Sequence, residues 1–231
     1  MNRLFFILVF VTLHFSAFGQ VEQPLFSDAV RKNFQFFKTQ SIQAYKYGDF
    51  ERGRFLFDSL VQNQLIGSKF NDFTLRKVSN QKLKISKVKK PIFLTTYAAW
   101  CVPSKGEIPA INRLAKEYSK DIEFVVIVWG KKKEAKKFAN KFNSKIEICY
   151  AHQNYKKDNN VVESMKETLG FPTCYMIDAQ LQVIDIRRGA LQLPLRTQSK
   201  KAVEENYLFF RERLNTLFLP DSISKEGLAT F

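Results

Sequence analysis

The sequence predicts an α/β domain built on a mixed β-sheet, preceded by a helical extension. First, apolar strand-like runs alternate with amphipathic helix-like runs from residue 66 onward, which is typical of parallel strands joined by helices. Second, a closing pair of strand-like runs at 173–178 and 182–187 is joined by a short turn, which requires antiparallel pairing. Third, residues 20–65 have helical periodicity and no strand-like run.

The first residues have the composition of a secretory signal peptide. Arg3 supplies a positive charge, residues 4–15 form an apolar core too short to span a bilayer comfortably, and residues 17–19 (AFG) are a small-x-small pattern. We therefore expect a signal peptide at 1–19, cut after Gly19, and a periplasmic or secreted product; an uncleaved anchor is the alternative. No other segment is apolar and long enough to cross a membrane, so we expect no transmembrane span in the mature chain.

Two helices account for the N-terminal helical extension, residues 20–65. Ser27 is in position to cap the first helix, whose apolar side chains recur on or near one face. Gly48 interrupts this pattern, and a second helix is predicted over 50–65. The apolar stripe of the extension is therefore interpreted as core or docking surface rather than as a ligand site.

The predicted elements of the main domain, residues 66–219, follow in order. Two short strands alternate around a turn at 79–80, and a strand of the fully buried type follows Pro91. Pro103 suits the first turn of the next helix, where a missing N–H costs little. The predicted strands span 73–75, 82–86, 91–97, 122–129, 146–150, 173–178 and 182–187, and the predicted helices span 102–118, 133–142, 160–169 and 199–219. Residues 220–231 are expected to form a flexible tail.

The chain is strongly basic. Its 37 Lys and Arg residues against 22 Asp and Glu residues give a formal net charge of +15 at pH 7. The basic residues occur in small clusters, which we interpret as solvated helix and loop faces; affinity for anionic envelope surfaces or acidic partners is the alternative. The sequence contains no nucleic-acid-binding motif, and an exported protein would not meet such a partner, so we predict no nucleic-acid binding.

Cys101 carries the most chemical information. It follows a buried strand and precedes the helix predicted at 102–118, and a helix N-terminus favours the thiolate, which is the nucleophilic form. A dithiol redox site would read Cys-x-x-Cys, but the fourth position here is Ser104. The remaining cysteines, Cys149 and Cys174, lie in apolar strands, and three cysteines are too few for a disulfide scaffold.

Three segments, in the expected order, resemble one protein family. Residues 93–111 (FLTTYAAWCVPSKGEIPAI) are similar to the active-site region of TlpA-like thioredoxin-fold proteins, which are exported thiol–disulfide oxidoreductases of the redoxin or AhpC/TSA type. Residues 67–75 (GSKFNDFTL) resemble the first hairpin of that family, and residues 170–178 (GFPTCYMID) resemble its cis-proline strand. The resemblance covers residues 66–215 and implies a three-layer, thioredoxin-like α/β fold with a mixed central sheet.

The resemblance also implies roles for individual residues. Cys101 matches the catalytic nucleophile, and Glu107 matches an acidic residue that handles protons near the site. Pro172 matches a proline whose preceding peptide bond is cis, which would expose the Phe171 backbone for pairing with an extended substrate strand. The residues implied to bind substrate are Trp100, Phe171, Pro172 and Thr173.

Ser104 departs from the family pattern. A serine cannot release a mixed disulfide, although it can donate a hydrogen bond to the Cys101 thiolate and lower its pKa. Three interpretations stay open: Cys101 works as a monothiol resolved by an external thiol, another cysteine such as Cys174 resolves it, or the site is a remnant on a binding module. A buried apolar role is the simpler interpretation of Cys174.

Other chemistries lack the residues that they need. The peroxiredoxin motif Pro-x-x-x-Thr-x-x-Cys requires proline and threonine where this chain has Leu94 and Ala98, so peroxidase activity is not expected. His152 is the single histidine after the predicted cleavage site, which leaves little material for a Cys-His or Ser-His hydrolase. The sequence has no metal-ligand cluster and no Gly-rich phosphate loop, so no metal or other cofactor is expected.

The sequence therefore predicts an exported thioredoxin-like protein that carries out monothiol thiol–disulfide exchange through Cys101. Its predicted partners are protein thiols and disulfides of the cell envelope, with an external thiol or redox partner for recycling. The alternative is a non-catalytic interaction module, in which Cys101 is incidental and the helical extension binds a partner.

Overall fold

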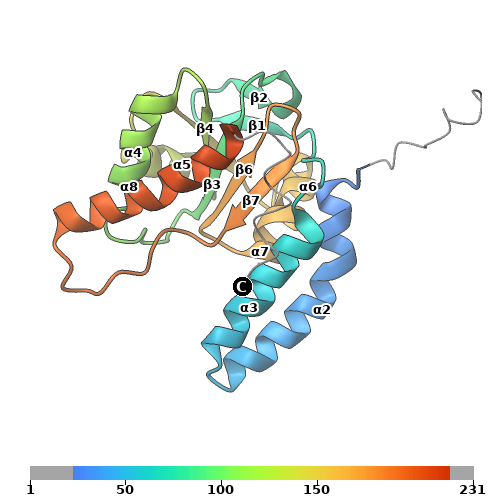
Figure 1. The fold of residues 1–231 in the computed structure, drawn as a ribbon. Coiled ribbons are helices and arrows are strands. Elements are labelled where there is room, and N and C mark those ends of the chain that lie inside the picture. The colour runs from blue at the N-terminus through green and yellow to red at the C-terminus, as the bar shows by residue number, and fades with distance from the viewer. Residues whose placement is uncertain (1–22, 219–231) are drawn as a thin grey trace, which may run out of the picture.

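The computed structural model describes residues 23–218, in which seven strands form one sheet with the order β2-β1-β5-β4-β3-β6-β7 (Figure 1). The strands are β1 (Thr74–Lys77), β2 (Lys82–Lys84), β3 (Ile92–Ala98), β4 (Glu123–Trp129), β5 (Ile146–Ala151), β6 (Thr173–Ile177) and β7 (Val183–Arg187). Each strand overlaps a predicted one. The predicted signal peptide at 1–19 and the predicted tail at 220–231 lie outside the described residues.

Parallel pairing is confined to the centre of the sheet. β3 pairs with β4 in parallel, and β4 pairs with β5 in parallel. The other neighbouring strands, β6 beside β3, β7 beside β6 and β1 between β5 and β2, are antiparallel. All seven residues of β3 are buried, as expected for a strand that is covered on both faces. The predicted mixed sheet is therefore confirmed.

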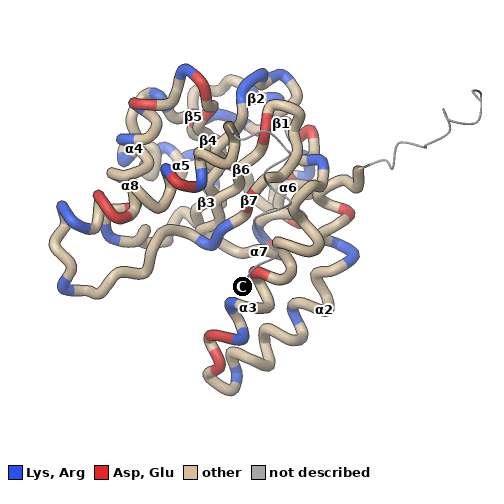
Figure 2. Tube along the Cα trace, viewed as in Figure 1, with Lys and Arg blue, Asp and Glu red and all other residues tan. Residues whose placement is uncertain are grey.

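Helices cover both faces of the sheet, so the molecule has three layers (Figure 1). One face carries α4 (Glu107–Tyr118), α5 (Lys132–Ala139) and α8 (Ser199–Asn215). The other face carries α2 (Phe26–Lys46), α3 (Phe50–Leu60), α6 (Asn159–Val161) and α7 (Glu167–Leu169). None of these helices is long and apolar enough to cross a membrane. Positions occupied by Lys and Arg are spread over helices, loops and strand ends (Figure 2).

The alternation of side chains along the strands divides the core into two halves. Phe93 packs into the half beneath α4 and α8, whereas its neighbour Leu94 packs into the half beneath α2 and α3. The two buried cysteines lie on opposite faces of the sheet. Cys174 packs into the half of the core beneath α4 and α8, and Cys149 packs into the half beneath α2 and α3. Cys101 packs against the half that contains Cys174.

The first helix does not use the predicted cap. Ser27 lies inside α2, which begins at Phe26, and the Ser27 backbone N–H donates to Oδ1 of Asn71 at 2.9 Å. The Asn71 Nδ2 group in turn donates to the Ser27 hydroxyl at 2.9 Å. A side chain distant in sequence therefore takes the place of a local cap, and it ties the extension to the loop before β1.

The helix predicted at 160–169 is irregular. It consists of α6, a π-helical stretch Val162–Lys166, and α7. The Ser164 hydroxyl donates back to the Asn160 carbonyl, and the Thr168 hydroxyl donates back to the Ser164 carbonyl at 2.7 Å. Such back-bonding by serine and threonine competes with regular helical hydrogen bonds. This segment leads directly into the loop before β6.

Candidate functional site

Cys101 lies in the loop that joins β3 to α4. It follows the end of β3 by three residues, and its backbone N–H donates to the Ala98 carbonyl at 3.0 Å. The thiol is free and half-buried, with its side chain packed against the core half beneath α4. The Cys101 sulfur is therefore placed near the surface, just beyond the carboxyl end of the buried strand β3.

The helix predicted at 102–118 is wrong at its start, because α4 begins only at Glu107. Gly106 immediately before it has a φ of +82°, in the left-handed region that interrupts a right-handed helix. A Cβ at Gly106 would lie 2.5 Å from the Ala202 carbonyl carbon, so the close approach of α8 requires glycine here. Cys101 consequently lies in a loop, several residues before the first turn of the helix.

The surroundings of Cys101 favour the thiol over the thiolate. Burial is the largest cause, and it raises the pKa of the Cys101 thiol; a hydrogen bond with the Ala98 backbone partly offsets this effect. Glu107 raises the same pKa further, whereas the charge of Lys141 lowers it. The expectation of a thiolate favoured by a helix N-terminus is therefore wrong, because no helix begins at Cys101.

Glu107 is a buried carboxyl group with two hydrogen-bond donors. Its side chain is 0% exposed, Oε1 accepts from the Tyr97 hydroxyl at 2.7 Å, and Oε2 accepts from the Ser104 backbone N–H at 2.9 Å. Burial raises the pKa of Glu107, and the two hydrogen bonds partly offset that rise. A carboxyl with a raised pKa beside a thiol can accept and return a proton.

The side chain of Ser104 makes a different contact from the predicted one. Its hydroxyl accepts a hydrogen bond from Gln192 Nε2 at 3.4 Å, and its backbone N–H is the donor to Glu107. No hydrogen bond between Ser104 and Cys101 occurs in the described part of the chain. Ser104 therefore contributes to the site mainly through its backbone, by orienting the Glu107 carboxylate.

The loop before β6 forms the other side of the site. The Phe171–Pro172 peptide bond is cis, and Gly189 backs it so closely that a Cβ there would lie 2.9 Å from Pro172 Cγ. The Phe171 ring meets the Trp100 ring edge to face, with 5.4 Å between centroids. Thr173 begins β6, and its hydroxyl donates to the Gly170 carbonyl at 3.1 Å. Trp100, next to Cys101 in the chain, is therefore in contact with Phe171 at the cis-proline, while the role of these residues in binding substrate stays a prediction.

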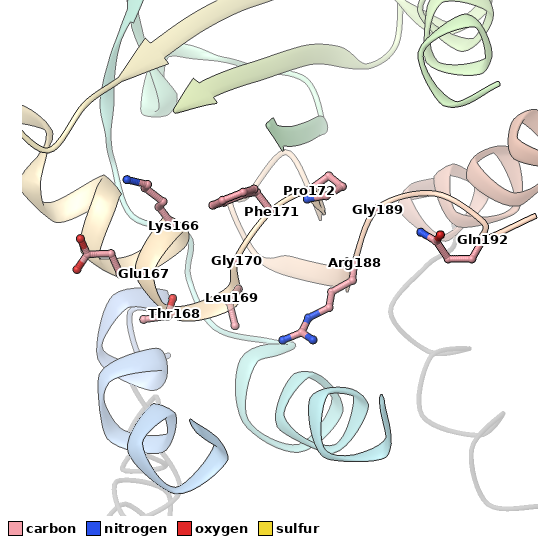
Figure 3. Close-up of a pocket in the computed structure, with 10 residues that line it drawn as sticks. All are labelled: Lys166, Glu167, Thr168, Leu169, Gly170, Phe171, Pro172, Arg188, Gly189 and Gln192. Carbon is pink, nitrogen blue, oxygen red and sulfur yellow. The ribbon is translucent and has the colours of Figure 1, made fainter. Parts of the chain in front are cut away.

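A hollow of about 430 Å³ lies next to this loop. Phe171, Pro172, Gly189 and Gln192 line part of its wall, and Figure 3 shows the Arg188 side chain directed away from Pro172. The Arg188 guanidinium donates to the Tyr45 hydroxyl at 3.1 Å and lies 4.3 Å from the centre of the Phe57 ring. Arg188 therefore links the helical extension to the wall of the hollow.

The other two cysteines are deeply buried. The Cys174 sulfur lies 3.2 Å from the Thr95 hydroxyl, and burial raises the pKa of this thiol far above its ordinary range. Burial raises the pKa of Cys149 to about 12. Both thiols are thus protonated at neutral pH, which favours the apolar interpretation of both. Among residues 23–218, no three His, Cys, Asp or Glu side chains gather as a metal site would require.

Tyr97 and Asn206 were not predicted as site residues from the sequence. The side chain of Asn206, fully buried in α8, donates to the Lys105 carbonyl at 3.0 Å and accepts from the Leu191 N–H at 3.0 Å. It therefore joins the loop that contains Ser104 to the loop that contains Leu191. A tyrosine near the end of an apolar strand signals a hydroxyl in need of a buried partner. The sequence contains no comparable signal for the loop carbonyl and N–H that Asn206 contacts.

The mixed sheet is covered on both faces, a cysteine follows β3, and a cis-proline precedes the adjacent strand β6. These features define a thioredoxin-fold protein of the thiol–disulfide oxidoreductase class. The chain belongs to the AhpC/TSA family, whose model matches residues 66–186. This match confirms the family indicated by the sequence motifs, and it begins where the helical extension ends.

The chain is also similar to individual known proteins. The chain is 27% identical over 144 residues to the thioredoxin-like protein YneN of Bacillus subtilis (strain 168), covering 60% of this chain and 76% of that protein. It is also 27% identical over 129 residues to the thiol-disulfide oxidoreductase ResA of Geobacillus kaustophilus (strain HTA426), covering 54% of this chain and 71% of that protein. A solved thioredoxin domain of a thiol-disulfide oxidoreductase from Bacteroides vulgatus has a TM-score of 0.48 and 16% identity, covering 65% of this chain and 98% of that one.

Proposed function

We propose that this protein is an exported monothiol exchange protein, with Cys101 as the nucleophile that acts on disulfides and thiols of envelope proteins. The observation that carries the proposal is a free, half-buried Cys101 beside the cis-proline loop, with Ser104 at the position of a second cysteine. The signal-peptide-like composition of residues 1–19 supports export. The main domain at 66–219 would carry the exchange chemistry.

The first step is the attack on a substrate disulfide. Glu107 takes the proton of the Cys101 thiol, and the resulting thiolate attacks one sulfur of the substrate disulfide. A Cys101–substrate disulfide forms as the substrate S–S bond breaks, and the other substrate sulfur leaves as a thiolate that takes the proton from Glu107. The raised pKa of Glu107 suits both transfers, because it brings the carboxyl closer to the pKa of a thiol.

The second step needs a thiol that this site lacks. A thiolate from outside the protein, or the freed thiolate of the same substrate, attacks the substrate sulfur of the mixed disulfide and releases Cys101 as a thiolate. When the attacking thiolate belongs to the substrate, its disulfides are rearranged without net oxidation. Cys174 is a poor candidate for this step, because its buried thiol has a pKa raised far above neutrality.

The substrate would lie along the cis-proline loop. The backbone of Phe171, just before β6, would pair with an extended segment, and the exposed Trp100 ring offers an apolar contact next to Cys101 in the chain. Thr173 lines this region only from within, because its backbone N–H and carbonyl are both hydrogen-bonded to the Thr96 hydroxyl. The helical extension at 20–65 reaches this region through the contact between Arg188 and Tyr45.

The experiment that tests the proposal is the capture of mixed disulfides on a defined substrate. The protein is incubated with a synthetic peptide that is joined through one disulfide to a separate small thiol, so that the freed thiol leaves and cannot attack the adduct from within the same molecule. Thiols are then blocked with an alkylating agent, and the intact mass is measured. We expect the protein to accumulate a peptide adduct on Cys101, because Ser104 cannot release it. The Cys101→Ala variant should form no adduct, and adducts of equal yield on both proteins would disprove the proposal.

The buried cysteines provide matched controls. Cys149→Ala removes a cysteine from the opposite face of the sheet and should leave the adduct yield unchanged. Cys174→Ala should also leave it unchanged if an external thiol resolves the intermediate. A marked rise in adduct yield with Cys174→Ala would instead identify Cys174 as the resolving thiol.

A second candidate function is a non-catalytic interaction module. The observation that favours it is the raised pKa of Cys101, which lowers the reactivity of the resting thiol. A module of this kind would form no peptide adduct on Cys101 above the level of a free thiol in a small peptide, so the same measurement distinguishes the two functions.

A further inference from the structure

The surface around Cys101 is apolar at its centre. Trp100 is 78% exposed and Val102 is 92% exposed, on either side of the cysteine. Phe171 extends this surface across the cis-proline loop through its edge-to-face contact with Trp100. Apolar side chains at the centre of a surface and charged groups at its rim are typical of sites that bind another polypeptide.

A basic hollow of about 240 Å³ borders this apolar centre on the side of α5. Its lining residues are Ala99, Trp100, Glu134, Lys137, Phe138 and Lys141. The Lys141 ammonium lies 4.5 Å from the centre of the Phe138 ring, and its charge is near enough to Cys101 to lower the pKa of that thiol. The hollow is therefore within electrostatic range of the reacting sulfur.

The two lysines of this hollow form no ion pair within the described part of the chain, although Glu134 also lines it. Neither Lys137 nor Lys141 forms an ion pair with any acidic side chain of the described residues. The carboxylate of Glu134 is engaged elsewhere, since its Oε2 atom accepts the Lys131 backbone N–H at 2.6 Å. Further lysines on α5 add to the positive charge of this side of the molecule (Figure 2).

The basic residues on the other side of the site are already occupied. Lys166 donates to the Gln153 side chain at 2.9 Å, and Arg188 contacts Tyr45 and the Phe57 ring (Figure 3). The ammonium groups of Lys137 and Lys141 make no hydrogen bond to another side chain among the described residues, so they are the cations beside the site that are free to meet a substrate.

We propose that Trp100, Lys137 and Lys141 form a docking surface for an acidic segment of the polypeptide whose cysteine exchanges with Cys101. The inference rests on the proposed function and names its substrate class. A carboxylate on the substrate would enter the hollow between Trp100 and α5 and meet the two unpaired ammonium groups. Such rim charges act mainly on the rate of association and on the choice of partner.

The test uses two synthetic peptides that share one disulfide and the same neighbouring apolar residues. One peptide carries two glutamates near the disulfide, and the other carries glutamines in their place. The rate constant for adduct formation on Cys101 is measured for each. We expect the acidic peptide to react about five- to tenfold faster at low salt, as two exposed ion pairs would produce. The difference should largely disappear in about 1 M sodium chloride, where the Debye length is about 3 Å.

Lysine variants test whether Lys137 and Lys141 cause the difference between the two peptides. The double variant Lys137→Gln/Lys141→Gln should bring the ratio of the two rate constants close to one. The ratio is the appropriate measure, because loss of Lys141 also changes the Cys101 pKa and so slows both peptides equally. The matched control is Lys116→Gln/Lys120→Gln, which removes two exposed lysines at the far end of α4 and should preserve the ratio.

The outcomes separate this inference from the proposed function. If adducts form at the same rate with both peptides, or if the α5 and α4 variants change the ratio equally, the docking surface is disproved and the exchange function stands. If neither peptide forms an adduct on Cys101, the exchange function fails, and the inference fails with it.

Discussion

At the scale of single residues, the proposed chemistry depends on proton transfer from the Cys101 thiol to the Glu107 carboxylate. Burial raises the pKa of both groups, and the Tyr97 hydroxyl donates directly to the Glu107 carboxylate at 2.7 Å. Tyr97 itself is fully buried, and the charge of Glu107 adds to the burial that raises the Tyr97 pKa, so its hydroxyl stays protonated and remains a donor. Tyr97 is thus a positioning residue that acts through Glu107.

We predict that Tyr97→Phe shifts the pH dependence of Cys101 reactivity to higher pH. The hydrogen bond from Tyr97 lowers the Glu107 pKa, so its loss raises that pKa and delays the appearance of the carboxylate that accepts the thiol proton. The rate of adduct formation near pH 7 should fall about tenfold, which is less than the complete loss of acid–base catalysis would cause, because Glu107 itself remains. The measurement is the rate constant against pH.

Tyr175→Phe is the matched control for this variant. The Tyr175 hydroxyl is buried and has no hydrogen-bond partner among the described residues, and its ring belongs to the opposite half of the core. Its removal should leave the pH dependence of Cys101 reactivity unchanged. A profile that is the same for wild type and Tyr97→Phe would show that Tyr97 does not tune Glu107.

At the scale of elements, the start of α4 is determined by α8. The backbone of Gly106 approaches the Ala202 carbonyl so closely that no side chain fits, and Asn206 joins α8 to the Lys105 carbonyl. The loop from Cys101 to Gly106 is therefore held from the C-terminal helix rather than by its own hydrogen bonds alone. This contact explains why Glu107, and not Val102, begins the helix.

We predict that Gly106→Ala destabilises the protein by more than about 2 kcal/mol, because a positive φ and a steric overlap with backbone act together. Gly48→Ala is the control, since Gly48 also has a positive φ, +73°, but a Cβ there would meet nothing within 4 Å. It should cost about 1 kcal/mol. Urea unfolding measures both, and equal losses would argue against the contact with α8.

At the scale of the whole molecule, the helical extension shares a core with the sheet. Phe26 at the start of α2 is fully buried, with its ring centroid 5.5 Å from that of Phe70 and 5.9 Å from that of Tyr175 in β6. The extension and the thioredoxin-like domain therefore contribute to the same half of the core. A shared core favours unfolding in one cooperative transition.

We predict that Phe26→Ala lowers the free energy of unfolding by about 3–5 kcal/mol, as expected for a large aromatic removed from a packed core. Phe36→Ala, which removes a 73% exposed ring from the same helix, should change it by less than about 0.5 kcal/mol. Unfolding is followed by tryptophan fluorescence and by far-ultraviolet circular dichroism. Separate transitions by the two methods would show that the extension unfolds on its own.

Most of the fold could be predicted because its signals are local. The buried strand at 92–98 is rich in apolar and β-branched residues, and the turn between the first two strands contains Asn80, which tolerates its positive φ of 75°. The site was predicted less completely. Tyr97, Gln192 and Asn206 act through partners 10 to 101 residues away in the chain, and no local pattern identifies such partners.

The sequence by itself determined the order of strands and helices, the position of Cys101 after the buried strand β3, the serine at position 104 and the family of the protein. These properties follow from apolar periodicity and from short motifs, which are carried by neighbouring residues. Only the tertiary structure decided where α4 begins, that burial raises the pKa of Cys101, and that Lys137 and Lys141 line a hollow beside Trp100. Those properties depend on burial and on the approach of α8 and α5, which only the folded chain brings together.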